Sequence, residues 1–177
     1  MLGFGDSNSN NAIDLLKRDH RQVEELFDQY EKAKDDSNKA ARQELAGRIC
    51  AALSLHAQIE EEIFYPAMRR GGKDAKELVD EAAVEHQSVK DIIGRLQNAS
   101  PEDPLYDAGV KVLSEYVKHH VKEEENEMFP DAKSADIDLD ALGLAIAKRK
   151  EELEASGSAL PPARRTRSTA RRPARKN

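Results

Sequence analysis

The stretch HAQIEEEIFYP, residues 56–66, recurs 64 residues later as HVKEEENEMFP, residues 120–130. In both copies a glutamate follows the histidine by four residues and a proline follows it by ten. Four residues turn an α-helix by about 400°, so His56 and Glu60 share one helix face, as do His120 and Glu124. The repeat therefore predicts two helices that each present an imidazole and a carboxylate on the same side.

Two further histidines precede the two copies, each after an acidic residue. They are His20, 36 residues before His56, and His86, 34 residues before His120. Apolar residues flank all four histidines at steps of three and four, which is typical of the buried face of a helix. On the first helix that buried face comprises Ile13, Leu16, His20, Val23, Phe27 and Tyr30, and on the fourth it comprises Val112, Tyr116, His120 and Glu124.

The composition favours one helical domain. The 177 residues are 38% hydrophobic, 35% charged and only 5% aromatic, which suits long helices with a solvated outer face better than a sheet. Short polar breaks separate the four predicted helices. We therefore expect an all-α fold: an antiparallel up-down-up-down four-helix bundle over residues 11–132, after a flexible N-terminus at residues 1–10. A short fifth, accessory helix is expected over residues 136–155.

The C-terminal residues 156–177 read as a disordered basic tail. Seven positive charges fall in the last fourteen residues, and without them the formal net charge of −6 becomes −13. An acidic body argues against nucleic-acid binding by the bundle, whereas the tail is expected to bind polyanions weakly and in a salt-sensitive way, or only to be flexible. A single cysteine, Cys50, and the lack of an apolar run that could span a bilayer favour a cytoplasmic protein without membrane contact.

The buried histidines and glutamates predict a metal site. One histidine on an apolar helix face is more often a hydrogen-bonded core residue, but four in successive helices favour a metal site. Burying the two carboxylates without compensation would cost several kcal/mol each, and cations supply that compensation. Imidazole and carboxylate ligands without thiolate suit iron or manganese, and zinc less exclusively. The predicted metal ligands are His20, His56, Glu60, His86, His120 and Glu124.

These ligand types, their order and the FYP and MFP ends resemble the hemerythrin-like HHE cation-binding domain family. The resemblance covers the four-helix body and leaves the fifth helix and the tail outside it. It implies a non-haem centre of two Fe ions with an oxo or hydroxo bridge. By this resemblance His20 and His56 would bind one iron, His86 and His120 the other, and Glu60 and Glu124 would bridge the pair.

The sequence departs from the oxygen-carrying members at one position, because Lys90 stands where they have a fifth histidine, four residues after His86. Tyr116, one turn before His120, is a candidate iron ligand or hydrogen-bond partner, with a core tyrosine as the alternative. His119 is expected on the surface. An open coordination position would favour turnover or sensing of a small oxidant over bulk oxygen carriage.

Several functions remain open from the residues alone. The centre could bind or sense dioxygen or nitric oxide, or it could consume peroxide as an enzyme. It could also handle iron, or the bundle could be a regulatory interaction protein that uses its basic tail. Apart from the metal ligands, the sequence suggests no catalytic residue and no organic cofactor site.

Overall fold

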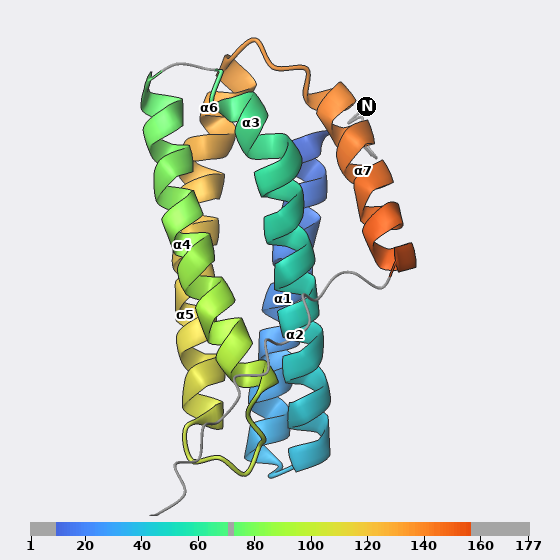
Figure 1. Ribbon diagram of the computed structural model, residues 1–177, viewed down its shortest axis with the longest axis vertical. Helices are drawn as coiled ribbons and strands as arrows, with labels where there is room; N and C mark the ends of the chain where they lie inside the picture. Colours follow the sequence, from blue (N-terminus) through green and yellow to red (C-terminus); the bar gives the residue numbers. More distant parts are fainter. Residues whose placement is uncertain (1–9, 71–72, 157–177) are drawn as a thin grey trace, which may run out of the picture.

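Four long helices form an antiparallel bundle in the computed structural model, which describes residues 10–70 and 73–156 (Figure 1). They are α1 (Ala12–Asp35), α2 (Lys39–Ile59), α4 (Lys73–Gln97) and α5 (Tyr106–Glu123). Contacts join α1 to α2, α2 to α4, α4 to α5 and α5 back to α1, so the four helices enclose one core. The predicted all-α up-down bundle is confirmed. The predicted flexible start, apart from residue 10, and the basic tail after residue 156 lie outside the described residues.

At the repeated stretch, α2 and α5 each pass into a single π-helical turn, which is wider than an α-helical turn. The π-helical turns η1 (Glu60–Phe64) and η2 (Glu124–Met128) lead into the short α-helices α3 (Tyr65–Met68) and α6 (Phe129–Ser134). The Tyr65 and Phe129 amides bond the carbonyls of Glu60 and Glu124, five residues back. A proline follows each of these amides and has no N–H to donate, so the wide turn lets the helix continue past it. The distortion thus lies on the N-terminal side of each proline.

The bundle core consists of two hydrophobic clusters. One contains Val23, Leu53, Val89 and Val117 with residues toward the α1–α2 turn, and the other contains Leu16, Phe64, Tyr65 and Phe129 at the opposite end. On α1, α2 and α4 the predicted histidine lies between residues of the two clusters, one turn away in either direction. On α5, Val117 of the first cluster lies one turn before His120, and the second cluster resumes at Met128, after Glu124. The histidines therefore occupy a polar layer between two apolar ones.

The predicted buried face of α1 is confirmed, but that of α5 is wrong at two positions. Val112 and Tyr116 are 42% and 47% exposed, and the buried positions are Val110, Leu113 and Val117, which lead to His120. Tyr116 was placed by stepping back four residues from His120, whereas the buried line steps back three, to Val117. One residue is about 100° of helix, enough to turn the tyrosine to the surface.

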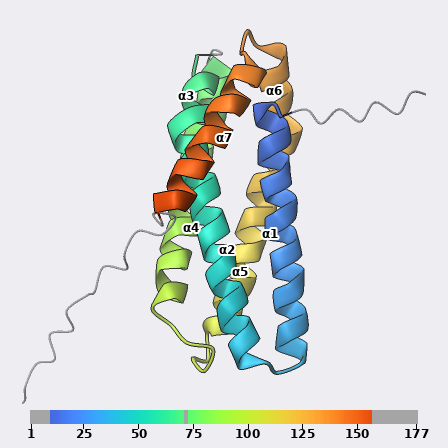
Figure 2. The same cartoon turned by 90° about the vertical axis from the view of Figure 1, so that its right-hand side faces the viewer.

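A fifth helix, α7 (Leu139–Ser156), packs outside the bundle against α1 and α2 (Figure 2). Ile146 and Leu153 are buried in the cluster that contains Leu16. Gly143 faces the backbone of residues 10 and 11 so closely that a Cβ atom there would clash with the Asn10 carbonyl. This close approach places the N-terminal part of α7 against the start of α1.

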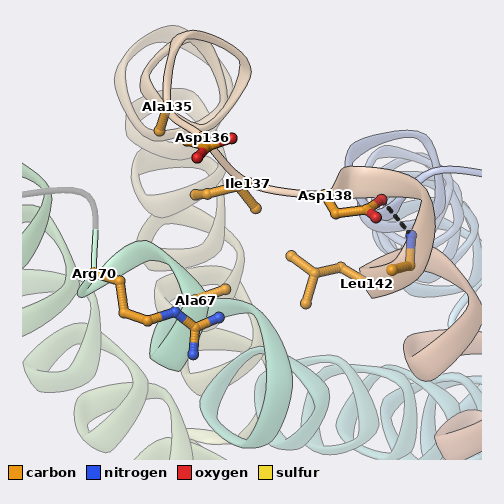
Figure 3. A pocket seen from close by; sticks show the side chains of 8 residues that line it. Ala67, Arg70, Ala135, Asp136, Ile137, Asp138 and Leu142 are labelled. Atoms are coloured by element: carbon orange, nitrogen blue, oxygen red, sulfur yellow. Dashed lines mark hydrogen bonds between the residues drawn. The ribbon is translucent and has the colours of Figure 1, made fainter.

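The connection from α6 to α7 crosses the end of α3 and leaves a surface cavity of about 460 Å³ (Figure 3). Ala67, Arg70, Ile137 and Leu142 are among its lining residues, and none of the six predicted ligands is. Asp138 caps α7 by accepting a bond from the Ala141 amide at 2.9 Å, so the helix begins after this residue. Within the described residues, no helix is both apolar enough and long enough to cross a membrane.

A buried guanidinium joins three helices at the end of the bundle opposite α3 and α6. Arg42, 8% exposed, donates to both carboxylate oxygens of Asp107 at 2.8 and 2.6 Å, and the Tyr30 hydroxyl donates to Oδ1 at 2.6 Å. Burial raises the pKa of Asp107, but the bonds from Tyr30 and Arg42 outweigh burial and leave it lowered. The carboxylate thus keeps the buried arginine paired.

We expect Asp107→Asn to destabilise the fold by about 1–3 kcal/mol, because it leaves the Arg42 charge buried without a counter-charge. Urea denaturation followed by circular dichroism measures this loss. Glu115→Gln, on the exposed side of the same helix, serves as the matched control and should change the unfolding free energy by less than about 0.5 kcal/mol. Equal stabilities of the two variants would contradict the assigned role of this pair.

Candidate metal centre

The six predicted ligands lie together in the polar layer of the bundle. α1, α2, α4 and α5 contribute one histidine each, and the two glutamates are the first residues of the π-helical turns. All six side chains are buried; Glu60 is 0% and Glu124 1% exposed. Two carboxylates so fully removed from water require positive charge beside them.

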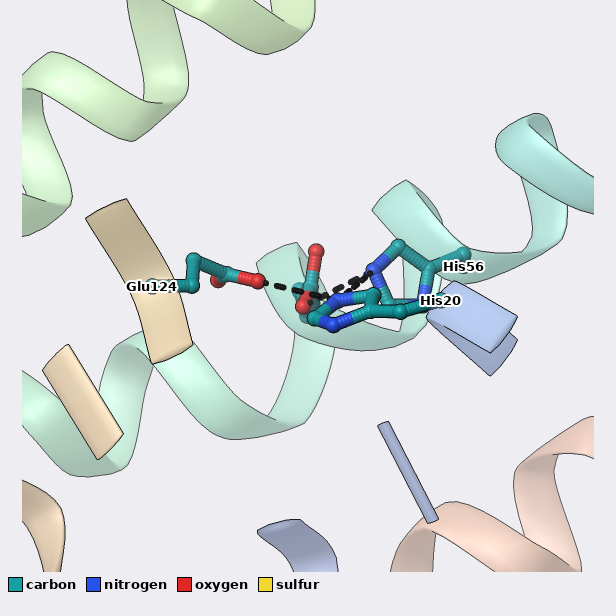
Figure 4. A group of neighbouring side chains, drawn as sticks. His20, His56 and Glu124 are labelled. Atoms are coloured by element: carbon teal, nitrogen blue, oxygen red, sulfur yellow. Dashed lines mark hydrogen bonds and ion pairs between the residues drawn. The ribbon is translucent and has the colours of Figure 1, made fainter. Parts of the chain in front are cut away.

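The first cluster contains His20, His56, Glu60 and Glu124. The Nε2 atoms of His20 and His56 are 3.2 Å apart. Glu60 Oε1 is 3.1 Å from His56 Nε2, and Glu124 Oε2 is 3.3 Å from His20 Nε2. Figure 4 shows the carboxylate of Glu124 and the two imidazoles pointing toward one another. Atoms that share one ion at about 2.1 Å lie about 3.0–3.4 Å from each other, so these separations suit a bound cation.

The second cluster contains His86 and His120, whose Nε2 atoms are 3.1 Å apart, with Glu60. Glu60 Oε2 is 3.3 Å from His86 Nε2, so the two oxygens of this carboxylate face different clusters. Glu124 Oε2 is 3.7 Å from His120 Nε2 as well as 3.3 Å from His20. Both glutamates therefore lie between the histidine pairs, where a bridging carboxylate would have to lie.

Each histidine also contacts a carboxylate through its other ring nitrogen, Nδ1. We call these four the outer carboxylates: Asp19 with His56 (3.5 Å), Glu61 with His86 (3.0 Å), Glu85 with His120 (2.7 Å) and Glu125 with His20 (2.9 Å). An outer carboxylate accepts the Nδ1 proton and so fixes the orientation and tautomer of the ring. The lone pair of each neutral imidazole then lies on Nε2 and points into the centre.

Two Nε2 lone pairs at 3.1–3.2 Å repel each other unless a cation lies between them. Both oxygens of Glu60 and Oε2 of Glu124 lack a hydrogen-bond partner of good geometry, although histidine nitrogens lie near them. Buried acceptors without donors are costly, and metal cations are the ligands that satisfy both nitrogen and oxygen lone pairs. The donor set thus fits metal ions.

Without a metal, protons take the place of the cation. Burial lowers the pKa of His56, but Glu60 and then Asp19 outweigh it and raise the pKa to about 10. Burial is likewise outweighed at His86, where Glu60 and Glu61 raise the pKa to about 9. Burial alone would raise the pKa of Glu60, yet the neighbouring His56 and His86 hold it well below its ordinary value. The centre therefore favours positive charge.

Tyr65 is the tyrosine at the centre, and sequence reasoning missed it in favour of Tyr116. Its hydroxyl donates to Glu124 Oε1 at 3.2 Å and lies 3.2 Å from His86 Nε2. Burial and the nearby glutamates raise the pKa of Tyr65 well above its ordinary value, so it remains a hydrogen donor. The equivalent residue in the second copy is Phe129, which stacks on His20 with ring centroids 5.8 Å apart. The FYP run after Glu60 was the signal that could have identified this tyrosine.

Basic side chains pair with three of the outer carboxylates. Lys90 bonds Glu61 at 2.6 Å, Lys150 bonds Asp19 at 2.5 Å, and Arg21 bonds Glu125 at 2.6 Å. Lys90 thus forms an ion pair at the rim, and its position supplies no fifth nitrogen. Lys150 comes from α7, so the fifth helix reaches the polar layer through Asp19.

A small chamber adjoins the histidines on the side of the first hydrophobic cluster. Val23, Leu53, Val89, Val117 and Val121 line it together with the four imidazoles, and its volume is about 20 Å³. This is about the space of one water-sized molecule. Only a small molecule can therefore lie beside the centre without moving the side chains.

The chain is similar to known proteins in sequence and, for one solved structure, in fold. The sequence profile named "Hemerythrin HHE cation binding domain" matches residues 11–132. The crystal structure of a hemerythrin HHE cation-binding domain-containing protein from Mycobacterium kansasii, a homologue of Rv2633c, superposes with a TM-score of 0.71 at 28% identity, covering 84% of this chain and 90% of that one.

The matches to two further relatives span very different shares of those proteins. Rv2633c of Mycobacterium tuberculosis, an uncharacterised protein, is 29% identical over 149 residues, which span 82% of this chain and 89% of the relative. A DNA nickase from Nostoc sp. (strain PCC 7120) is 32% identical over 126 residues, 70% of this chain. The match spans only 34% of the nickase, so most of that protein has no counterpart in the matched region.

The raised histidine pKa values predict how the metal-free protein responds to pH. The pKa values of His56 and His86 in the folded protein, about 10 and about 9, exceed the unfolded value of 6.5. Protonation of these two histidines therefore stabilises the fold fully below pH 6.5, and this contribution is lost as the pH rises through 9 and 10. We expect the unfolding temperature of chelator-treated protein to fall between about pH 7 and pH 10. Metal-loaded protein is the control and should change less, and a flat profile for the metal-free protein would refute the charge assignment.

Because the outer carboxylates orient the histidines, removing one of them should lower the metal affinity although it is not itself a proposed ligand. Glu125→Ala removes the acceptor of the His20 Nδ1 proton and should weaken metal binding about 10–100-fold. Glu127→Ala, exposed on the same turn, is the matched control and should bind as the unaltered protein does. Competition with a chelator of known affinity measures the difference. Indistinguishable affinities would show that Glu125 does not orient His20.

Proposed function

Since this chain belongs to the hemerythrin HHE cation-binding family, we propose that its six buried ligands bind two iron ions that react with a small oxidant. The observation that carries this proposal is the pair of histidine clusters joined by Glu60, whose two oxygens are 3.1 and 3.3 Å from histidines of different clusters. A carboxylate in this position would hold one cation with each oxygen. Iron suits the mixed imidazole and carboxylate donors, and an oxo or hydroxo bridge would complete the pair.

The bundle supplies three things to the reaction. The outer carboxylates hold the imidazoles in one tautomer, the buried glutamates would neutralise the cations, and Tyr65 donates a hydrogen bond to Glu124 Oε1. Bound iron would supply Lewis acidity and the electrons that reduce an oxidant. Because the four histidines come from four different helices, bound ions would also link those helices.

The chamber beside the histidines supports the choice of substrate class. Its volume of about 20 Å³ and its valine and leucine lining suit dioxygen, nitric oxide or hydrogen peroxide and exclude larger organic substrates. Neither Lys90 nor Tyr116 reaches the centre to supply a further ligand, so bound iron would keep a coordination position for such a molecule. We therefore favour oxidant turnover or sensing over bulk oxygen carriage.

The expected compartment is the cytoplasm, supported by the single cysteine.

Cys50 is buried, and burial raises the pKa of its thiol to about 11. A thiol that stays protonated reacts slowly with oxidants. The chemistry of the protein is thus assigned to the metal centre and not to this cysteine.

Iron analysis of protein from iron-replete cells tests the site. We expect about two irons per chain, and loss of at least one in His56→Ala and in Glu124→Ala, because each variant removes a ligand and leaves its partners unpaired. Lys118→Ala, exposed on α5, is the control and should keep both irons. A protein that holds zinc alone, or variants with unaltered iron, would refute the assignment.

Peroxide consumption by the iron-loaded protein tests the reaction. We expect consumption well above that of the same concentration of free iron, and none by the Glu124→Ala protein. A long-lived and fully reversible dioxygen adduct without peroxide consumption would identify a carrier instead. Iron that is bound and released without reacting with any of the three oxidants would favour iron handling.

A further inference from the structure

A third group of metal-ligating side chains lies outside the centre, on the surface formed by α4 and α5. His119 Nε2 is 3.4 Å from Glu85 Oε1 and 3.1 Å from Glu123 Oε1. The ligand atoms of the three residues lie within 4.8 Å of one another. We call these residues the outer triad. Its imidazole is 61% exposed, whereas the Glu85 side chain is 17% exposed and reaches inward.

The outer triad repeats the spacing of the inner ligands. His119 and Glu123 are four residues apart, as are His120 and Glu124, so two overlapping HxxxE pairs lie at the end of α5 and the start of η2. The two pairs differ by one residue, which turns them by about 100° on the helix. One pair therefore faces the buried centre, and the other presents the same donors to solvent.

The charges around the triad distinguish it from the other outer carboxylates. Lys150, Lys90 and Arg21 neutralise Asp19, Glu61 and Glu125, respectively. Glu85, by contrast, has no lysine or arginine ion pair within the described residues, and neither has Glu123. Two carboxylates with only a histidine between them form a local excess of negative charge. Such a group attracts a cation from solution.

In the first copy of the repeat, apolar side chains and α7 cover the position that corresponds to the outer triad. The residues equivalent to His119 and Glu123 are Leu55 and Ile59, which pack in the hydrophobic cluster that α7 joins. Lys150 of α7 covers Asp19, the counterpart of Glu85. The second copy has donors and solvent where the first has apolar side chains and a helix.

We propose that the outer triad binds a divalent transition-metal cation and delivers it to the inner centre. The proposal rests on the inner centre being the metal site proposed above. Glu85 connects the two, because its Oε1 faces His119 while its Oε2 accepts the His120 Nδ1 proton at 2.7 Å. An imidazole with two carboxylates selects transition metals over magnesium and calcium. Three protein ligands and solvent in the other positions make a weak site from which a cation can move on.

Manganese(II) titration of the metal-free full-length chain, followed by electron paramagnetic resonance, tests binding at the triad. We expect one weakly bound equivalent beyond those of the inner centre, and its loss in His119→Gln and in Glu123→Gln. Glu115→Gln, which removes an exposed carboxylate from the same helix, is the matched control and should keep it. Circular dichroism should show equal helicity in all four proteins. An unchanged number of equivalents in both triad variants would overturn the proposal.

The rate of iron loading tests delivery. Anaerobic mixing of metal-free protein with ferrous iron should load the inner centre about 10-fold more slowly in His119→Gln than in the unaltered protein, because the triad loses its nitrogen ligand and holds the cation less well. The final iron content should be equal. Equal loading rates would overturn the delivery role. Failure of the inner centre to take up iron in any protein would refute the proposed function instead, and the manganese titration would still report on the triad.

Discussion

Four imidazoles and two carboxylates share the middle of the bundle, and their lone pairs all point inward. The outer carboxylates take the Nδ1 protons, so the Nε2 atoms of each histidine pair face each other at 3.1–3.2 Å with nothing to share unless a cation or a proton is present. The two glutamates lie in the same layer and are buried from bulk solvent. This electrostatic constraint explains why both apolar clusters of the bundle end at the histidines, and why the rim of the layer is rich in ion pairs.

The repeat in the sequence becomes an approximate twofold relation between the halves of the centre. In each half, the acidic residue before one histidine contacts the histidine of the HxxxE pair, and the residue after each glutamate contacts a histidine of another helix. The halves differ in the aromatic residue five positions after each glutamate. Tyr65 provides a hydroxyl beside His86, whereas Phe129 provides only a ring beside His20.

Spacing along single helices predicted the bundle and brought six residues to one layer, because helix periodicity is a local property. Tyr116 was misplaced and Tyr65 was missed for a related reason. A stripe drawn at steps of three and four leaves open which residue is buried, and it does not include the wider turn that brings Tyr65 inward after Glu60. Partners across helices, such as Glu85 for His120, depend on how the helices pack. The sequence places acidic residues directly before His20 and His86 but does not show which histidine each of them contacts.

Gly143 lets α7 approach the backbone before α1, and this has a practical consequence for where the domain can be cut. The family profile ends at residue 132, yet Ile146 and Leu153 belong to the same apolar cluster as Leu16. A fragment that stops at residue 132 would expose that cluster and leave Asp19 without Lys150. The packed body of this chain therefore extends past the family boundary, and expression fragments should extend through Ser156.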